Sequence, residues 1–325
     1  PTAPAQSGTP GAPGTAQTGS IPGAPAIQAA PGARRDAALR QSPRVPVNGP
    51  RLGGSIALKG GRIDDLTMLD YKATIDEGSP AVTLFSPQGA PQPYFGQFGW
   101  VPIGELKVPD SDTVWQADHP SVQPARPLTL SWDNGQGVRF IQVVEIDDNF
   151  MMTVTQRVEN NSTQAISTHP YGRIARTHTP NTLGFYILHE GPLAVFNETL
   201  KEVDYDDLQE GPADATKSTG GWIGITDKYW LAALIPDQKQ PYTGTFRYSK
   251  PNKQDTYQAD FMTQAPQLIA PGATAQTVSH VFVGAKEVTL LDRYEEQLGI
   301  ARFDLAVDFG WFYFLTKPFF YAIDW

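Results

Sequence analysis

Residues 128–162 read LTLSWDNGQGVRFIQVVEIDDNFMMTVTQRVENNS, and this stretch decides the fold. Apolar side chains alternate with polar ones along it, at Leu128, Leu130, Trp132, Met152, Val154 and Val158. The dipeptide Asn134-Gly135 favours a tight hairpin turn, and an Asp-Asp-Asn turn follows at 147–149. Such one-sided alternation is typical of antiparallel strands with one solvated face. The stretch therefore predicts a β meander.

Further strand patterns extend from this meander in both directions. Shorter strands are expected at 54–71 (as a hairpin), 82–86, 94–102, 165–175, 183–188, 192–197, 243–249 and 256–263. The almost uniformly apolar GGWIGITDKYWLAALIP at 220–236 predicts a central strand pair that turns at 226–228. Many strands followed by C-terminal helices predict a mainly β fold, a large antiparallel β-sandwich with a helical appendix.

The composition divides the chain into four predicted segments. Residues 1–51 are rich in Pro, Ala and Gly and predict a disordered tether, because they offer little apolar surface to bury. Residues 52–285 form the sandwich. A packing helix is expected at 286–300, where Gly299 follows an apolar stripe made by Val288, Leu291, Tyr294 and Leu298. Residues 301–325 predict an interfacial amphipathic helix that leads into a truncated transmembrane segment.

The last of these segments is unusually aromatic. It has nine aromatic residues between 309 and 325, against a chain average of 11%. Trp, Tyr and a single Lys favour the headgroup region of a bilayer, where the rings lie in hydrocarbon and the polar tips stay wet. The predicted membrane-interface residues are Phe303, Val307, Phe309, Trp311, Phe312, Phe314, Lys317 and Phe319. The alternative is an ordinary C-terminal helix docked on the domain.

Charge and cysteine content exclude several classes of function. A net charge of −9 argues against a nucleic-acid partner, which requires a basic surface. The absence of cysteine excludes disulfides, thiolate nucleophiles and cysteine metal sites. No signal peptide or complete transmembrane helix is recognisable. Because the first residue is Pro1 and not Met, we expect a fragment or a processed form.

Histidines offer the one candidate for catalysis. His169, His178 and His189 lie on neighbouring predicted strands, and with Glu190 they could form an acid/base set of the sugar-epimerising kind. Partly exposed histidines with no catalytic role are the simpler interpretation. The acidic run at 198–214 lacks the ligand spacing of a calcium loop. We expect no catalytic, cofactor-binding or metal-binding residues.

The segments at 220–236 and 281–320 resemble the periplasmic domain of the bacterial membrane protein insertase YidC. The motif residues in the first segment are Trp222, Asp227, Tyr229, Trp230 and Pro236. The resemblance covers roughly residues 52–325 and implies a β-supersandwich related to galactose mutarotase. It also implies that 303–317 is the family's interfacial helix and that Phe319 begins its second transmembrane helix. The family's membrane-embedded core is absent from this sequence, so we do not expect the chain to insert proteins alone.

The resemblance implies a non-enzymatic role on the periplasmic side of the bacterial inner membrane. The domain would assist insertion and folding of inner-membrane proteins, alone or with the Sec translocon. Its implied partners are membrane lipid, hydrophobic nascent membrane proteins and Sec translocon subunits, with no nucleic acid and no cofactor. The main alternative is a mutarotase-like protein that binds or epimerises sugars, which requires His169, His178 and a carboxylate to converge in an open cleft. A third interpretation is a purely structural periplasmic scaffold.

Overall fold

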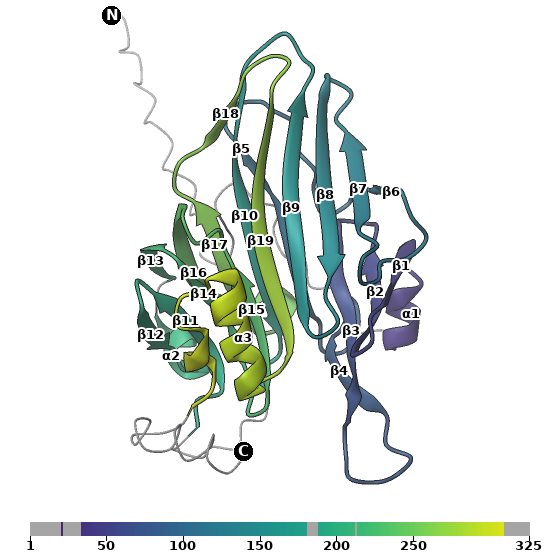
Figure 1. The fold of residues 1–325 in the computed structure, drawn as a ribbon, viewed down its shortest axis with the longest axis vertical. Coiled ribbons are helices and arrows are strands. Elements are labelled where there is room, and N and C mark those ends of the chain that lie inside the picture. The colour runs from purple at the N-terminus through teal and green to yellow at the C-terminus, as the bar shows by residue number, and fades with distance from the viewer. Residues whose placement is uncertain (1–20, 22–33, 181–187, 212, 309–325) are drawn as a thin grey trace, which may run out of the picture.

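The structure, a computed structural model, describes Ile21 and residues 34–180, 188–211 and 213–308. Two large antiparallel sheets pack against each other in this part of the chain (Figure 1). The larger sheet has ten strands, of which eight run in the order β1 (Arg44–Asn48), β2 (Leu52–Ala57), β3 (Arg62–Lys72), β5 (Tyr94–Pro102), β10 (Ile166–Thr177), β17 (Thr256–Thr263), β16 (Pro241–Ser249) and β13 (Asp214–Thr219). The other two are β4 (Ala81–Phe85), which pairs with β3, and β18 (Gln267–Ile269), which pairs with β10.

The second sheet has nine strands. Their order is β12 (Thr199–Glu202), β11 (Gly191–Phe196), β14 (Gly221–Thr226), β15 (Trp230–Ile235), β19 (Thr274–Ala285), β9 (Met151–Asn160), β8 (Val138–Ile146), β7 (Leu128–Asp133) and β6 (Gln116–Ala117). The helical elements are α1 (Arg35–Leu39), α2 (Tyr205–Glu210), α3 (Val288–Leu298) and the short 3₁₀ turns η1 (Pro251–Lys253) and η2 (Phe303–Ala306). The predicted β-sandwich with C-terminal helices is confirmed.

One hydrophobic core lies between the sheets. It combines Phe98 and Ile174 of the larger sheet with Phe140 and Val154 of the smaller one. The Trp100 and Phe140 ring centroids lie 5.1 Å apart in an edge-to-face arrangement that joins the two sheets. These strands are therefore held by side-chain packing between layers as well as by their own hydrogen bonds.

The predicted meander is present as β7, β8 and β9, which pair in chain order. Met152, Val154, Gln156 and Val158 are buried, and Thr153, Thr155 and Arg157 between them are half-buried. The first turn is fixed by Asp133, whose Oδ1 accepts a hydrogen bond from the Gly135 amide at 2.7 Å. The alternation in the sequence thus corresponds to one face in the core and one facing out.

The predicted central pair is present as β14 and β15. Its uniform apolarity has a physical reason, because both faces of these strands are covered. One face meets the core, and η2 lies against the other, where the Phe303 ring is 5.6 Å from that of Trp222 on β14. On the neighbouring strand β19, the Phe282 ring lies 6.1 Å from Tyr294 of α3.

The predicted boundary of the tether at residue 51 is wrong. The helix α1 and the strand β1 lie inside residues 1–51, and Val45 and Val47 of β1 are buried. Pro46 between them is exposed, which is compatible with an edge strand because proline there leaves no sheet hydrogen bond unmade. Ile21 is also buried. The strand predicted at 183–188 lies almost entirely outside the described residues.

Candidate functional site

The end of the sandwich that carries Asp308, the last described residue, is the candidate site. Three segments meet there: the β14–β15 turn, the β19–α3 junction and the residues after η2. The loop between β3 and β4 reaches out at the same end, which is the lower end in Figure 1. We call the surface formed by 227–229, 285–287 and 307–308 the exit face.

Hydrogen bonds fix the chain between α3 and Asp308 to the sandwich. Gly299 ends α3 in the left-handed conformation, with φ of 64°. The Ala301 amide then donates to Oε1 of Gln238 at 3.2 Å, and Trp222 donates its indole N–H to the Arg302 carbonyl at 3.2 Å. Glu295 of α3 accepts from the Asp304 amide at 2.9 Å. Three hydrogen bonds therefore hold the segment from Ala301 to Asp304 against the rest of the domain.

Phe303 lies inside the domain, and its predicted role at the membrane interface is corrected. Its side chain is 0% exposed, between Trp222 and Phe282. The helix expected to run onward from Phe303 is also interrupted, because η2 ends at Ala306 and Val307 is extended, with φ of −99° and ψ of 121°. An apolar helical period cannot distinguish a face that meets protein from one that meets lipid, since both require apolar residues.

A cavity of about 450 Å³ opens on the exit face. It is lined by Tyr71, Leu188, Lys228, Tyr229, Trp230, Ala285, Lys286, Glu287, Val307 and Asp308. Tyr229 at its rim is 58% exposed, and the Lys228 ammonium lies 4.8 Å from the centre of its ring. The Trp230 ring lies edge to face with Tyr71 at 5.1 Å. Aromatic rings beside a lysine form the amphipathic surface that the headgroup region of a bilayer favours.

Glu287 organises the polar wall of this cavity. Arg51 donates to both of its carboxylate oxygens, at 2.5 and 3.2 Å, and the Tyr71 hydroxyl donates to Oε1 at 2.5 Å. Burial alone would raise the pKa of Glu287, but the bonds from Arg51 and Tyr71 outweigh it and lower the pKa below its ordinary value. Burial and the bond to Glu287 raise the pKa of Tyr71 to about 12. The guanidinium of Arg51 also lies 4.3 Å from the Phe150 ring centre.

Lys286 is a largely buried cation next to this network. Its Nζ donates to Oγ1 of Thr226 at 3.0 Å. Burial lowers the pKa of Lys286, although the carboxylates of Asp227 and Asp308 oppose the shift.

Asp227 ties the β14–β15 turn to the opposite sheet. Its Oδ1 lies 2.6 Å from Nη1 of Arg176 on β10. The pair lines a second, more polar cavity of about 400 Å³, which also has Tyr94, His178 and Trp230 in its wall. Trp230 lines both cavities, so the strand end next to Lys228 and Tyr229 lies between them.

The contacts of the histidines do not support a shared catalytic site. Nδ1 of His169 lies 2.8 Å from the Thr263 carbonyl, Nε2 of His178 2.6 Å from that of Pro91, and Nε2 of His189 3.0 Å from that of Pro192. Only His178 of these three lines the polar cavity, where the lining carboxylate among the described residues, Asp227, is paired with Arg176.

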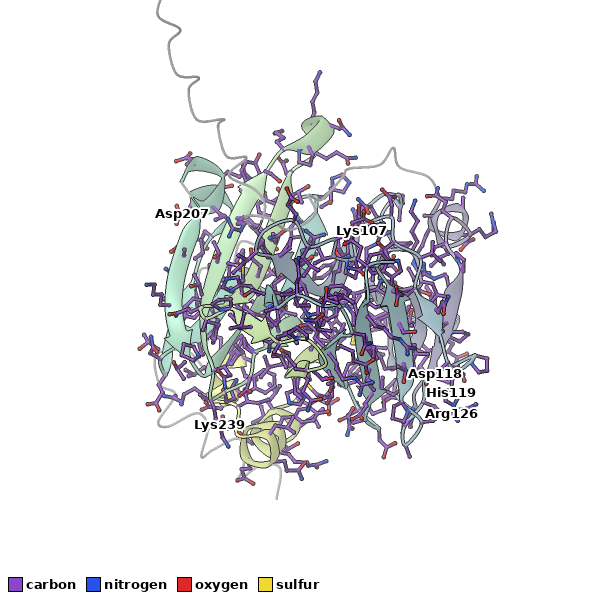
Figure 2. The ribbon with its side chains drawn as sticks, turned by 90° about the horizontal axis from the view of Figure 1, so that it is seen from above. Lys107, Asp118, His119, Arg126, Asp207 and Lys239 are labelled. Atoms are coloured by element: carbon purple, nitrogen blue, oxygen red, sulfur yellow. The ribbon has the colours of Figure 1, made fainter. Side chains whose placement is uncertain are left out.

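A fourth histidine lies apart, at the rim of the sandwich. Figure 2 places His119 beside Asp118 and Arg126, and its Nδ1 is 2.9 Å from Oδ1 of Asp118. Across residues 34–180, 188–211 and 213–308, no three His, Cys, Asp or Glu side chains are grouped as a metal site would require. None of the helices in those ranges has the length and apolar character that crossing a bilayer takes.

The remaining predicted residues divide into two groups. Trp222, Asp227 and Trp230 brace the exit face as described, Tyr229 is exposed on it, and Pro236 is buried and accepts a hydrogen bond from Gln238. Val307 is half-buried in the wall of the exit cavity. The other predicted membrane-interface residues lie outside the described residues, namely Phe309, Trp311, Phe312, Phe314, Lys317 and Phe319.

Arg51, Tyr71 and Glu287 of this site are not predicted from the sequence. Arg51 falls in the predicted tether, and its contact with Glu287 joins positions 236 residues apart. No local pattern signals such a pair.

A family model described as "YidC periplasmic domain" matches residues 44–322. "Membrane protein insertase YidC" of Methylobacterium nodulans is 44% identical over 324 residues, covering 97% of this chain and 53% of that protein. The same-named protein of Rickettsia bellii is 42% identical over 286 residues, covering 87% of this chain and 51% of that protein. The chain therefore spans about half the length of the curated relatives it matches.

The fold is similar to that of a galactose mutarotase related enzyme from Lactobacillus acidophilus. The TM-score is 0.51 at 8% sequence identity, over 74% of this chain and 97% of that one. At this identity the likeness is one of fold alone.

Proposed function

The chain belongs to the YidC periplasmic domain family, and on that premise we propose that it is the periplasmic part of a membrane protein insertase. Its role is to hold the segment after Asp308 at the surface of the inner membrane, at a fixed depth and angle. The insertase as a whole assists hydrophobic nascent proteins into that membrane. The role of the domain is not enzymatic, since the relatives are named insertases and the mutarotase likeness is one of fold.

The observation that carries this proposal is the fixation of the chain at the exit face. Three hydrogen bonds, to Gln238, Trp222 and Glu295, and the buried Phe303 ring hold the last described turn against the sandwich. A rigid origin limits the directions in which the following segment can run. The aromatic residues of 309–325 are the part that we expect to enter the interface.

Exposed groups around the exit face support the proposal that this face is turned toward the membrane. Tyr229 and Lys228 are presented together on the β14–β15 turn. Ile75 in the loop between β3 and β4 is fully exposed. Figure 1 shows this loop at the same end of the molecule. Isolated apolar side chains at one end, beside amphipathic ones, fit contact with a lipid headgroup layer.

Liposome flotation tests the proposal. We expect the 325-residue chain to float with vesicles of inner-membrane lipids and a chain ending at Asp308 to remain mostly in the soluble fraction. Leu268→Asp is the matched control, because Leu268 is a highly exposed leucine on β18, away from the exit face. Equal flotation of the long and short chains would contradict the proposal, and so would a loss in L268D as large as that of the truncation.

We further propose that the domain contacts Sec translocon subunits or a nascent chain through a sheet face. Val278 on β19 and Leu268 on β18 are exposed apolar side chains that could serve as contacts. Photo-crosslinkers placed at these two positions in the full insertase are expected to capture a translocon subunit or a nascent membrane protein. If the crosslinkers are active but capture neither a translocon subunit nor a nascent protein, the proposed contact through a sheet face is contradicted.

A further inference from the structure

The face of the larger sheet that is turned away from the core carries a small apolar patch. Val101 of β5, Tyr171 of β10 and Met262 of β17 lie on it together. Tyr171 is directly opposite Gly99 in one neighbouring strand and Met262 in the other. The adjacent residue Trp100 points the other way, into the main core.

Gly99 makes room for the Tyr171 ring of this patch. A Cβ atom at Gly99 would come within 2.6 Å of the Tyr171 hydroxyl, so the tyrosine ring lies across the glycine where any other residue would push it away. The ring forms the floor, and Val101 and Met262 stand beside it. We call the surface made by Gly99, Val101, Tyr171 and Met262 the Ile21 seat.

Ile21 occupies this seat, although it lies 23 residues before β1 begins at Arg44. Its side chain is 1% exposed, and Tyr171 beneath it is also 1% exposed. An isoleucine in a Pro- and Gly-rich segment has no neighbours of its own to bury it. Its burial therefore comes from the sheet.

Polar residues bound the seat along the same face. Gln97 and Arg173 are directly opposite each other, Arg173 donates to the Gln97 side-chain oxygen at 3.1 and 2.5 Å, and Asp260 is opposite Arg173 on the next strand. All three are buried. Buried polar groups thus bound the apolar area on one side and limit its extent.

We propose that the Ile21 seat is an intramolecular docking site that fastens the N-terminal tail to the outer face of the larger sheet. Its occupant is Ile21 of the same chain. Residue 21 is then a point of contact with β5, β10 and β17, in addition to the contacts of α1. This fixes a second point of the chain on the sandwich, at the N-terminal side, as η2 does at the C-terminal side.

Paramagnetic relaxation tests this docking in the whole chain. Because the sequence has no cysteine, Ser20→Cys gives a single attachment point for a nitroxide next to Ile21. In the oxidised state we expect strong broadening of the Val101 and Met262 methyl signals, relative to the ascorbate-reduced state. The methyl signals of Val278, on β19 of the other sheet, serve as the internal reference and should keep their intensity.

Two variants of the labelled chain decide the outcome. Ile21→Asp should abolish the broadening, because a carboxylate does not replace an isoleucine on an apolar seat. Ile27→Asp makes the same change six residues further along the tail and should leave the broadening in place. No broadening in the parent chain, or the same response in both variants, would overturn the proposal. An Ile21→Ala variant with an unchanged circular dichroism spectrum repeats the test should the aspartate disturb folding.

Discussion

Phe303 links the sandwich to whatever follows it in the chain. Its ring is fully buried against Trp222 and Phe282, so it packs as a core residue does. Phe303→Ala should lower the free energy of unfolding by about 3–5 kcal/mol, because it leaves a cavity that the strands of the sheet cannot close. Urea unfolding followed by circular dichroism measures the change.

Tyr229→Ala is the matched control for that substitution, since it removes an aromatic ring from the exposed side of the same site. We expect it to change the free energy of unfolding by no more than about 0.5 kcal/mol. If both substitutions proved equally mild, Phe303 would not be the anchor described above.

The ion pair between Arg51 and Glu287 predicts how stability depends on pH. The pKa of Glu287 in the folded state is below its ordinary value of 4.5. Between these two pKa values the unfolded chain binds more protons than the folded one, so stability rises with pH there. The contribution is fully present above about pH 4.5 and is lost as the pH falls through the folded-state pKa.

Glu287→Gln should therefore flatten the acid side of the stability profile. Unfolding free energies measured from pH 3 to pH 7 should fall less steeply for E287Q than for the parent chain. Glu296→Gln, at an exposed position on α3, should keep the parent slope. The same acid-side slope in E287Q and the parent chain would show that Glu287 is not stabilised as its contacts with Arg51 and Tyr71 indicate.

At the scale of single residues, the sequence predicts some parts of the site and not others. Trp222 and Tyr229 belong to a recognisable motif, but nothing local indicates that one is buried and the other exposed. Arg51 and Glu287 meet only because β2 and the start of α3 are brought together by the fold. Phe303 belongs to an apolar pattern with helical spacing. That spacing does not specify whether protein or lipid covers the apolar face.

At the scale of the elements, the stability of α3 depends on the glycine that ends it. Gly299 has φ of 64°, and a Cβ atom there would meet no atom within 4 Å, so the conformation alone determines the cost of a side chain. Gly299→Ala should destabilise the protein by about 1 kcal/mol, because L-residues disfavour the left-handed region. Thermal unfolding measures the difference.

Gly78→Ala is the control for that strain. Gly78 also has open space around its Cβ position, but its φ is not in the left-handed range. Its substitution should be close to neutral. An equal loss in both variants would mean that the left-handed cap is not what ends α3 and turns the chain toward η2.

Strands with strong alternation are predicted well, and a short edge strand is not. The β7–β9 meander follows from period-two patterning along 128–160, and β14 and β15 follow from their continuous apolar run. The strand β1 is hidden because only Val45 and Val47 are buried, with a proline between them, in a Pro-rich segment. It is a strand because it pairs with β2, and a local sequence pattern does not specify the pairing partner of a strand.

At the scale of the whole domain, residues 34–180, 188–211 and 213–308 form a sandwich with the exit face at one end. The proposed function requires that this end of the domain faces lipid. The fold alone does not supply this orientation, since a mutarotase-related enzyme has a similar fold. We infer it from the aromatic composition of 309–325 and from the family membership.

Site-specific fluorescence in the presence of vesicles tests this orientation most directly. The chain has no native cysteine, so Phe314→Cys, Tyr229→Cys and Val278→Cys can each carry one environment-sensitive NBD dye. With vesicles of inner-membrane lipids, we predict a large blue shift and intensity gain at 314, a smaller one at 229 and none at 278. An unchanged signal at 314, or a change at 278 as large as at 314, would contradict the account.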